Sequence, residues 1–495
     1  LVGSEMCIRD RRMNIVELHK DRMQDSFSKD FLWGAAISAK QAEGDSDRAL
    51  TVADLQNYDP HDKAKVKGDL SLQEIMDRIE HPQDYIFPKK TGIDFYHRFR
   101  DDIKLLKDMG IKCFRFSVSW ARIYPDGAEE KPSEKGLLFY DQLLDILKEM
   151  DIEPIVTLYH DDMPVNLALK YNGFLHPRVV DLFVEYAALI MKRYQHKVTY
   201  WIPVNQINLT RVGLSSIGVI KDTVEDVEAV KWQGVHHKFI ACAKIREIGR
   251  TINAAFRFGA MLADFYVSPM TCKPEDVVFA TEKNQMTMFF FADVQLRGEY
   301  PGYALRYFKD NSIAIHADEN ELMLLKNNTL DFLAISYYNS NVVSYEKNTM
   351  AIGNAELNPY LKANPWGWTI NPLGLYDCFL NYWDRYGKPL MIAENGFGQI
   401  EELDSEHKLH DDYRIDYIKE HIRALQKAVQ HGVDVFAYCA WSPIDMVSSG
   451  TSEMKKRYGF IYNDQDDAGH GTQKRYPKDS YWWYRNVIAT NGNVF

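Results

Sequence analysis

Eight short apolar runs, each separated from the next by a stretch with helical periodicity, constrain the fold of this chain most strongly. The runs cover residues 31–38, 112–120, 153–159, 200–205, 256–263, 331–338, 389–394 and 434–441. Their apolar character is nearly continuous, which is typical of parallel strands that are covered on both faces.

Amphipathic helices are predicted between these runs. One helix places Phe95, Phe99, Ile103 and Leu106 on one face, with Gly110 just past its end as a C-cap. Another helix runs from about residue 177 to 194. A third helix ends near residue 432 and has four apolar residues along one face, Ile415, Ile418, Ile422 and Leu425. Eight strand–helix units predict an α/β fold, a single (β/α)₈ TIM barrel.

One domain is predicted over residues 28–495, because barrels often run long as single domains. Residues 1–27 are interpreted as a leader whose start is disordered. Leu1 to Arg12 lacks a secretory apolar segment and resembles translated adaptor or vector DNA, so Met13 is a plausible native start. The leader is therefore left out of the fold prediction.

Charge and cysteine usage exclude several classes of protein. The net charge is −11, the pI is near 5.8 and no dense Lys/Arg tract occurs, which argues against a nucleic-acid partner. No apolar stretch approaches the length of a membrane span. None of the six cysteines forms a CxxC pair, so neither a disulfide framework nor a structural zinc site is expected, and Cys113 and Cys439 are interpreted as core residues. This usage predicts a cytoplasmic protein.

Polar or aromatic residues lie within or at the ends of the apolar runs. They are Gln41, Arg115, His160, Asn205, Gln206, Tyr338, Glu394 and Trp441. The carboxyl ends of barrel strands form the face at which such barrels carry out chemistry. The stretches 42–92 and 338–372 are predicted to be long loops over the same mouth.

Two of these strand ends form a distinctive pair. An apolar run that ends in Asn-Glu, followed much later by one that ends in Glu-Asn-Gly, is the two-carboxylate arrangement of a retaining glycosidase. The second element is present as Glu394-Asn395-Gly396, but the first reads Asn205-Gln206. An amide cannot supply an acidic proton near neutral pH, so the proton donor is missing at position 206.

Seven ordered motifs carry a wider resemblance. They occupy residues 31–36 with 41–44, 114–123, 157–160, 205–206, 331–338, 394–396 and 456–462. On these motifs the chain resembles a family-1 glycoside hydrolase from about residue 31 to its C-terminus. The resemblance implies that Glu394 is the nucleophile and that Arg115 and Tyr338 contact its carboxylate.

The same resemblance implies a set of sugar-binding residues. Asn205 would bond the 2-hydroxyl, Gln41 and His160 would hold the outer hydroxyls, Trp441 would stack under the ring, and Trp368 would line the aglycone side. Planar side chains with several donors, together with an aromatic face, are what a sugar site requires. Taken singly, each residue has an ordinary structural interpretation. Their convergence on one barrel face favours a site.

The segment 445–458 is similar to the 6-phospho-β-glucosidase branch of the family. Members that act on plain sugars place a Glu-Trp pair here, whereas this chain has Ser448 and Ser449 followed by Lys456 and Tyr458. Hydroxyls and an ammonium group suit a dianionic phosphate. The branch commonly has a serine where Gly450 stands, and a solvated basic loop is the alternative interpretation.

Three functions stay open at this stage. The first is a β-glycosidase that favours good leaving groups such as thioglycosides or aryl glycosides, as plant thioglucosidases of the family carry Gln at this position. The second is an O-glycosidase that uses a substitute acid such as Asp161, and the third is a catalytically weak phosphosugar-binding protein. No cofactor and no metal are expected, and the partner is a small-molecule glycoside. The aglycone, the gluco or galacto preference and a homo-oligomeric state are left open.

Overall fold

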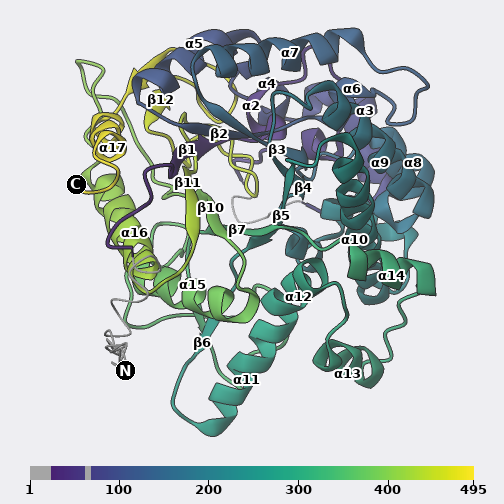
Figure 1. The fold of residues 1–495 in the computed structure, drawn as a ribbon. Coiled ribbons are helices and arrows are strands. Elements are labelled where there is room, and N and C mark those ends of the chain that lie inside the picture. Colours follow the sequence, from purple (N-terminus) through teal and green to yellow (C-terminus); the bar gives the residue numbers. More distant parts are fainter. Residues whose placement is uncertain (1–23, 62–67) are drawn as a thin grey trace, which may run out of the picture.

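Eight parallel strands close into a barrel, which confirms the predicted (β/α)₈ fold (Figure 1). The structure is a computed structural model that describes residues 24–61 and 68–495. The strands follow one another around the barrel as β1, β2, β3, β4, β5, β7, β10 and β11, with β11 pairing back to β1. Their bounds are Leu32–Ala36, Cys113–Ser117, Glu153–Tyr159, Tyr200–Val204, Arg257–Ala263, Phe332–Tyr337, Leu390–Asn395 and Val435–Ala440.

Seven of the eight predicted runs contain one of these strands, and β10 extends one residue beyond its predicted run, to Asn395; nearly every strand residue is buried. A parallel strand that is covered on both faces needs apolar side chains on both, which is why the runs are readable in the sequence. Gly34 on β1 is required by close packing, because a Cβ at this position would collide with the carbonyl oxygen of Cys113 on β2.

Helices surround the barrel (Figure 1). The longer ones are α3 (Leu72–Glu80), α5 (Phe95–Asp108), α7 (Glu134–Glu149), α9 (Pro177–Arg193), α10 (Val227–Ile252), α11 (Pro274–Asn284), α12 (Phe290–Arg297), α13 (Gly302–Asp310), α14 (Glu319–Asn327), α15 (Pro372–Tyr386), α16 (Asp412–Gln430) and α17 (Asp479–Ala489). Short helices are α2 (Ala39–Ala42), α4 (Pro88–Thr91), α6 (Trp120–Ile123) and α8 (Val165–Tyr171). The three helices predicted from periodicity are confirmed as α5, α9 and α16. The predicted apolar face of α5 is buried, and Gly110 follows its end with φ of 89°.

The two long connections are more structured than predicted. The stretch 42–92 contains α3, which begins with a capping box in which Ser71 and Glu74 satisfy each other's backbone amides. The stretch 338–372 contributes β8 (Asn341–Val343) and β9 (Glu356–Leu357) to a small sheet with β6 (Val267–Pro269). The prediction that these two stretches are long loops is therefore wrong in part, because each contains regular secondary structure. A separate hairpin pairs β12 (Ile461–Asn463) with β13 (Arg475–Pro477).

The start of the described chain packs into the core. Phe27, which the predicted boundary assigns to the leader, is buried with its ring 4.4 Å from that of Phe31 and 5.1 Å from that of Trp33. Most of the predicted leader lies outside the described residues. Cys113 and Cys439 are buried core residues, as predicted, with their sulfur atoms 3.7 Å apart.

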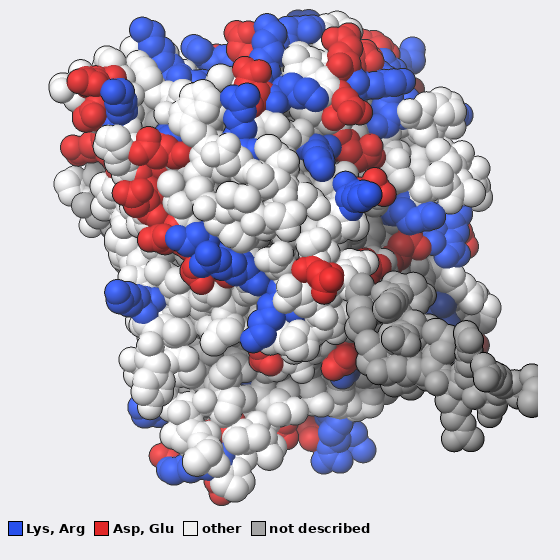
Figure 2. All heavy atoms as spheres, turned by 60° about the vertical axis from the view of Figure 1, so that its left-hand side comes forward, with Lys and Arg blue, Asp and Glu red and all other residues white. Residues whose placement is uncertain are grey.

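Charged side chains of both signs are interspersed over the face drawn in Figure 2. Within residues 24–61 and 68–495, no helix has the length and apolar character needed to cross a membrane. The five cysteines of these ranges are all free.

Candidate active site

A cavity of about 800 Å³ opens at the carboxyl ends of the barrel strands. All of the predicted site residues except Arg115 line it, and Arg115 lies fully buried just behind Glu394. Parallel strands bring their carboxyl ends to one face, so residues separated by hundreds of positions in the chain meet there.

Glu394, near the end of β10, accepts hydrogen bonds from three side chains. Arg115 donates from Nη1 at 2.6 Å, the hydroxyl of Tyr338 donates at 2.7 Å and the amide of Gln206 donates at 3.2 Å. Burial and the neighbouring Glu394 carboxylate raise the pKa of Tyr338 well above its usual value, so this hydroxyl stays a donor. Such donors stabilise an ionised carboxylate, the form that a nucleophile requires.

Arg115 also fixes the residue next to position 206. Its Nη2 donates to Oδ1 of Asn205 at 2.7 Å, and its Nε donates to the Thr157 hydroxyl at 3.1 Å. With its oxygen held in this way, Asn205 presents its amide Nδ2, which is buried and has no partner among the described residues. A free donor beside the nucleophile can bond a substrate hydroxyl.

Gln206 follows β4 in the left-handed region of the backbone, with φ of 37°. Its amide touches Oε2 of Glu394 directly. Two carboxylates this close could not both ionise without strong repulsion, whereas an amide and a carboxylate form an ordinary hydrogen bond. The arrangement can hold a nucleophile in place, but position 206 has no proton to give to a leaving group.

Other carboxyl groups near the cavity differ in their surroundings. Asp161 lies 3.7 Å from the ammonium of Lys40. Burial raises the pKa of Asp264, which lines the cavity, to about 6, and its Oδ2 has no partner. Burial also raises the pKa of Asp162 to about 6. Asp162 does not line the cavity, however, and its Oδ1 accepts a hydrogen bond from the backbone N–H of His160. Asp264, which the sequence did not single out, is therefore a cavity carboxyl whose protonated form is favoured by burial.

Gln41, His160 and Trp441 all line the cavity. The amide of Gln41 donates to the Val447 carbonyl at 2.7 Å. Burial, Lys40 and Arg115 lower the pKa of His160 well below its usual value, so the ring is neutral, and its Nδ1 has no partner. The rings of His160 and Trp441 are 6.2 Å apart.

The loop that carries Ser448 and Ser449 also lines the cavity, together with Lys456 and Tyr458. The ammonium of Lys456 lies 3.9 Å from the centre of the Trp368 ring, and burial lowers its pKa to about 8. Among the described residues, no carboxylate oxygen lies within salt-bridge distance of it. Thr451, beside Gly450, has a buried hydroxyl without a partner. This end of the cavity therefore offers an unpaired cation and a free hydroxyl, which suits an anion.

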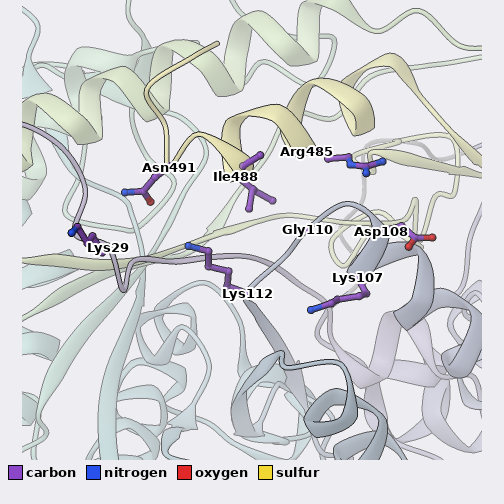
Figure 3. Close-up of a pocket in the computed structure, with 9 residues that line it drawn as sticks. Lys29, Lys107, Asp108, Gly110, Lys112, Arg485, Ile488 and Asn491 are labelled. Carbon is purple, nitrogen blue, oxygen red and sulfur yellow. The ribbon is translucent and has the colours of Figure 1, made fainter.

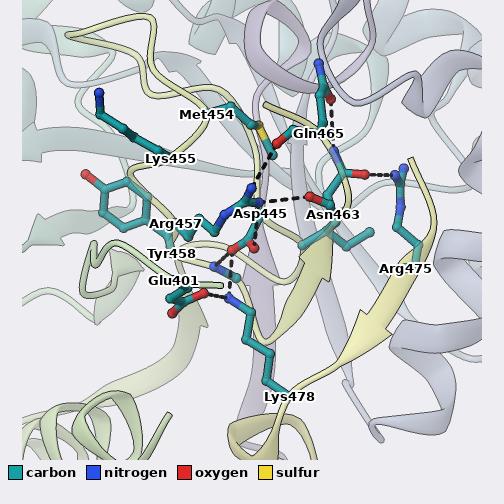
Figure 4. A network of polar contacts seen from close by, with 12 residues as sticks. Glu401, Asp445, Met454, Lys455, Arg457, Tyr458, Asn463, Gln465, Arg475 and Lys478 are labelled. Atoms are coloured by element: carbon teal, nitrogen blue, oxygen red, sulfur yellow. Dashed lines mark hydrogen bonds and ion pairs between the residues drawn. The ribbon is translucent and has the colours of Figure 1, made fainter. Parts of the chain in front are cut away.

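A buried ion network supports this loop from behind (Figure 4). Asp445 accepts from Lys478 at 2.9 Å and lies 3.3 Å from Arg457, and Lys478 also pairs with Glu401. Arg457 further donates to the carbonyl of Asn463 at 2.9 Å. Asp445 and Arg457 lie in segments that the sequence analysis singled out, but no role was predicted for any residue of this network, because none of them lines the cavity.

Two further lysines were also missed. Lys89 is buried and donates to the Ser449 carbonyl at 2.8 Å and to Gln56. The pKa of Lys89 is lowered well below its usual value, chiefly by burial and to a lesser extent by the nearby charge of Lys40. Lys40 also lines the cavity. In the chain it directly precedes Gln41. Its adjacency to a predicted site residue was the only available signal.

A second cavity lies near the amino ends of the strands (Figure 3). Lys29, Lys107, Lys112 and Arg485 surround a space of about 500 Å³ that Ile488 closes on one side. It contains neither an aromatic ring nor a pair of carboxylates, and most of its cations are exposed. It therefore lacks the groups that a glycosidase site needs.

Known proteins of one kind match nearly the whole chain. The model of the family described as "Glycosyl hydrolase family 1" matches residues 23–493. The chain is 41% identical over 472 residues to aryl-phospho-β-D-glucosidase BglH of Bacillus subtilis (strain 168), covering 94% of this chain and 98% of the relative. It is 39% identical over 475 residues to 6-phospho-β-glucosidase AscB of Escherichia coli (strain K12), with the same coverage. The solved structure of the β-glucosidase from Thermotoga maritima in complex with glucoimidazole superposes with a TM-score of 0.80 at 28% identity, covering 95% of this chain and 100% of that one.

Proposed function

This chain belongs to glycosyl hydrolase family 1, and we propose that it hydrolyses 6-phosphorylated β-glucosides through a covalent intermediate on Glu394. The observation that carries the proposal is the set of donors around that carboxylate. Arg115 and Tyr338 bond it directly, and Asn205 keeps a free amide beside it. A protein that only binds sugar has no need of a carboxylate that several donors hold at this point.

In the first step, an oxygen of Glu394 attacks the anomeric carbon and the bond to the leaving group breaks. In an ordinary retaining enzyme a second carboxyl protonates the leaving oxygen, and such an acid contributes roughly 10²–10⁴-fold. Gln206 cannot do so, and the leaving group therefore departs as an anion. Aryl glycosides and thioglycosides, whose leaving groups are stable anions, are the substrates that this chemistry favours.

In the second step, water attacks the anomeric carbon, the bond from that carbon to the Glu394 oxygen breaks, and the sugar phosphate is released. A residue that protonated the leaving group would normally deprotonate this water, and Gln206 cannot do that either. The intermediate is therefore expected to decay slowly, unless another group or an external base takes the proton.

Phosphate recognition is assigned to the end of the cavity formed by Lys456, Tyr458 and the loop 448–451. The unpaired ammonium of Lys456 is available to a dianion, and the free hydroxyl of Thr451 provides a donor in the loop where Gly450 cannot. The relatives named aryl-phospho-β-D-glucosidase and 6-phospho-β-glucosidase support this substrate class.

Steady-state kinetics with matched aryl β-glucosides, with and without a 6-phosphate, test the proposal. The phosphorylated substrate should have the higher kcat/KM, and Lys456→Met should remove most of that advantage. Lys455→Met is the matched control, because Lys455 pairs with Glu453 and Asp467 outside the cavity. Equal kcat/KM values for the two substrates in the unaltered protein would refute phosphate recognition.

A second candidate is an O-glycosidase with a substitute acid. Burial raises the pKa of Asp264 to about 6, which suits that role, whereas Asp161 is paired with the ammonium of Lys40. A substitute acid would make the rate nearly independent of leaving-group pKa across an aryl series. Asp264→Asn would then restore a steep dependence, and Asp161→Asn would not. A steep dependence in the unaltered protein would exclude this candidate.

A further inference from the structure

Lys40 and Asp161 form a buried ion pair on the cavity wall. The ammonium of Lys40 lies 3.7 Å from Oδ2 of Asp161, beyond the range of a good hydrogen bond. Both side chains line the cavity. In the chain, Lys40 directly precedes Gln41 and Asp161 directly follows His160, so the pair stands beside the two residues assigned to the outer hydroxyls of the sugar.

The hydrogen-bonding capacity of the pair is not satisfied by the residues that the structure describes. Oδ1 of Asp161 is buried and has no partner among them. Asp161 is the one charged partner of Lys40 in the described chain, and the ammonium donates no hydrogen bond to the described residues. An ammonium can only donate and an ionised carboxylate can only accept. A group that completes both must accept one hydrogen bond and donate another, and a hydroxyl does both.

We propose that Lys40 and Asp161 together recognise one outer ring hydroxyl of the sugar. The hydroxyl oxygen accepts from Nζ of Lys40, and its hydrogen is donated to Oδ1 of Asp161. This assignment rests on the proposed function and names a specificity determinant of the same site.

The alternative ligand for Lys40 is the sugar phosphate, and the charges argue against it. A phosphate dianion offers acceptors only and would be repelled by the Asp161 carboxylate. Lys456 has no such carboxylate within salt-bridge distance in the described chain. The two lysines therefore divide recognition, with Lys456 serving the phosphate and Lys40 serving a hydroxyl.

Calorimetric titration of the unaltered protein with an alkyl 6-phospho-β-glucoside, which turns over slowly, tests the assignment. Analogues that lack the 2-, 3- or 4-hydroxyl are titrated in parallel. We expect the 3-deoxy or the 4-deoxy sugar to bind about 10²-fold more weakly than the parent, because its loss leaves the buried pair unsatisfied. The 2-deoxy analogue is the reference, since that hydroxyl is assigned to Asn205.

Lys40→Met and Asp161→Asn each keep the size of the side chain. Both variants should bind the parent sugar at least 10-fold more weakly and should lose discrimination against the same deoxy analogue, while their penalty for the 2-deoxy sugar is unchanged. Lys456→Met should show the opposite pattern, losing the preference for phosphate and keeping the discrimination between hydroxyls.

These patterns separate the two ideas. If the protein ignores phosphate but the variants still lose hydroxyl discrimination, the proposed substrate class fails and the hydroxyl assignment stands. If both variants, folded by circular dichroism, discriminate among the three analogues as the unaltered protein does, the assignment is overturned. It is equally overturned if the unaltered protein tolerates the loss of both outer hydroxyls.

Discussion

Replacing Gln206 by a glutamate should supply the acid that position 206 lacks. The amide nitrogen of Gln206 lies 3.2 Å from Oε2 of Glu394, so the new carboxyl is placed beside the nucleophile without any change in side-chain size. Repulsion would push the two groups toward the separation of about 5.5 Å that is typical of retaining pairs.

At about 5.5 Å and an effective dielectric constant of about 20, two carboxylates repel by about 3 kcal/mol. This repulsion corresponds to a factor of about 10² in the protonation equilibrium, so the pKa of the carboxyl introduced at position 206 rises toward neutrality, while Arg115 continues to donate a hydrogen bond to Glu394. A general acid poised in this range contributes roughly 10²–10⁴-fold.

The assay is kcat/KM for an alkyl 6-phospho-β-glucoside, whose leaving group needs a proton. We expect Gln206→Glu to raise it by about 10²-fold or more, with activity falling at alkaline pH as the new acid ionises. Gln206→Leu is the control and should give no gain. An unchanged rate in a folded Gln206→Glu protein would refute the reasoning, because it would mean that the site is built around the amide.

Three further predictions follow from single contacts. Tyr338→Phe removes the hydroxyl that donates to Glu394, a hydrogen bond that contributes about 1.5–3 kcal/mol. The rate of glycosylation by an activated aryl substrate, measured by stopped flow, should fall about 10- to 100-fold, and a fall below about 3-fold would contradict the role of Tyr338. Because the pKa of Lys456 is about 8, affinity for a 6-phospho-β-glucoside should be retained below that pH and fall as the pH rises through it. Affinity for a plain glucoside should not change over the same pH range, and identical pH profiles of affinity for the two sugars would rule out Lys456 as the phosphate ligand. Lys478→Met leaves Glu401 and Asp445 without their shared cation and should lower the free energy of unfolding, measured with denaturant, by about 3–5 kcal/mol. Lys419→Met, at a more exposed ion pair, should lower it by less than about 0.5 kcal/mol, and similar losses in the two variants would contradict the role of the network.

The barrel could be predicted because its signals are local. A strand such as Glu153–Tyr159 is buried on both faces and therefore reads as a continuous apolar run, and the apolar face of α5 repeats at helical spacing. The gathering of Gln41, Asn205 and Glu394 also followed from the fold alone, since parallel strand ends share one face.

What could not be predicted depends on contacts between distant segments. Nothing in the sequence signals that Lys89 reaches the carbonyl of Ser449, 360 positions away, or that Lys40 pairs with Asp161. The helix at 72–80 was missed because its insert was assigned as a whole to an irregular loop, although Ser71 and Glu74 mark its start. The direct contact of the Gln206 amide with Glu394 likewise required coordinates.

Intact-protein mass spectrometry tests the central claim most directly. The protein is mixed with an aryl 6-phospho-β-glucoside carrying a good leaving group, and the reaction is quenched at short times. The mass of the intact protein is measured, and a second portion is digested to locate any adduct. We expect a covalent 6-phosphoglucosyl adduct that accumulates, maps to the peptide containing Glu394 and is absent from Glu394→Gln. Release of the aryl group without any adduct at the shortest times, or an adduct on another residue, would contradict it.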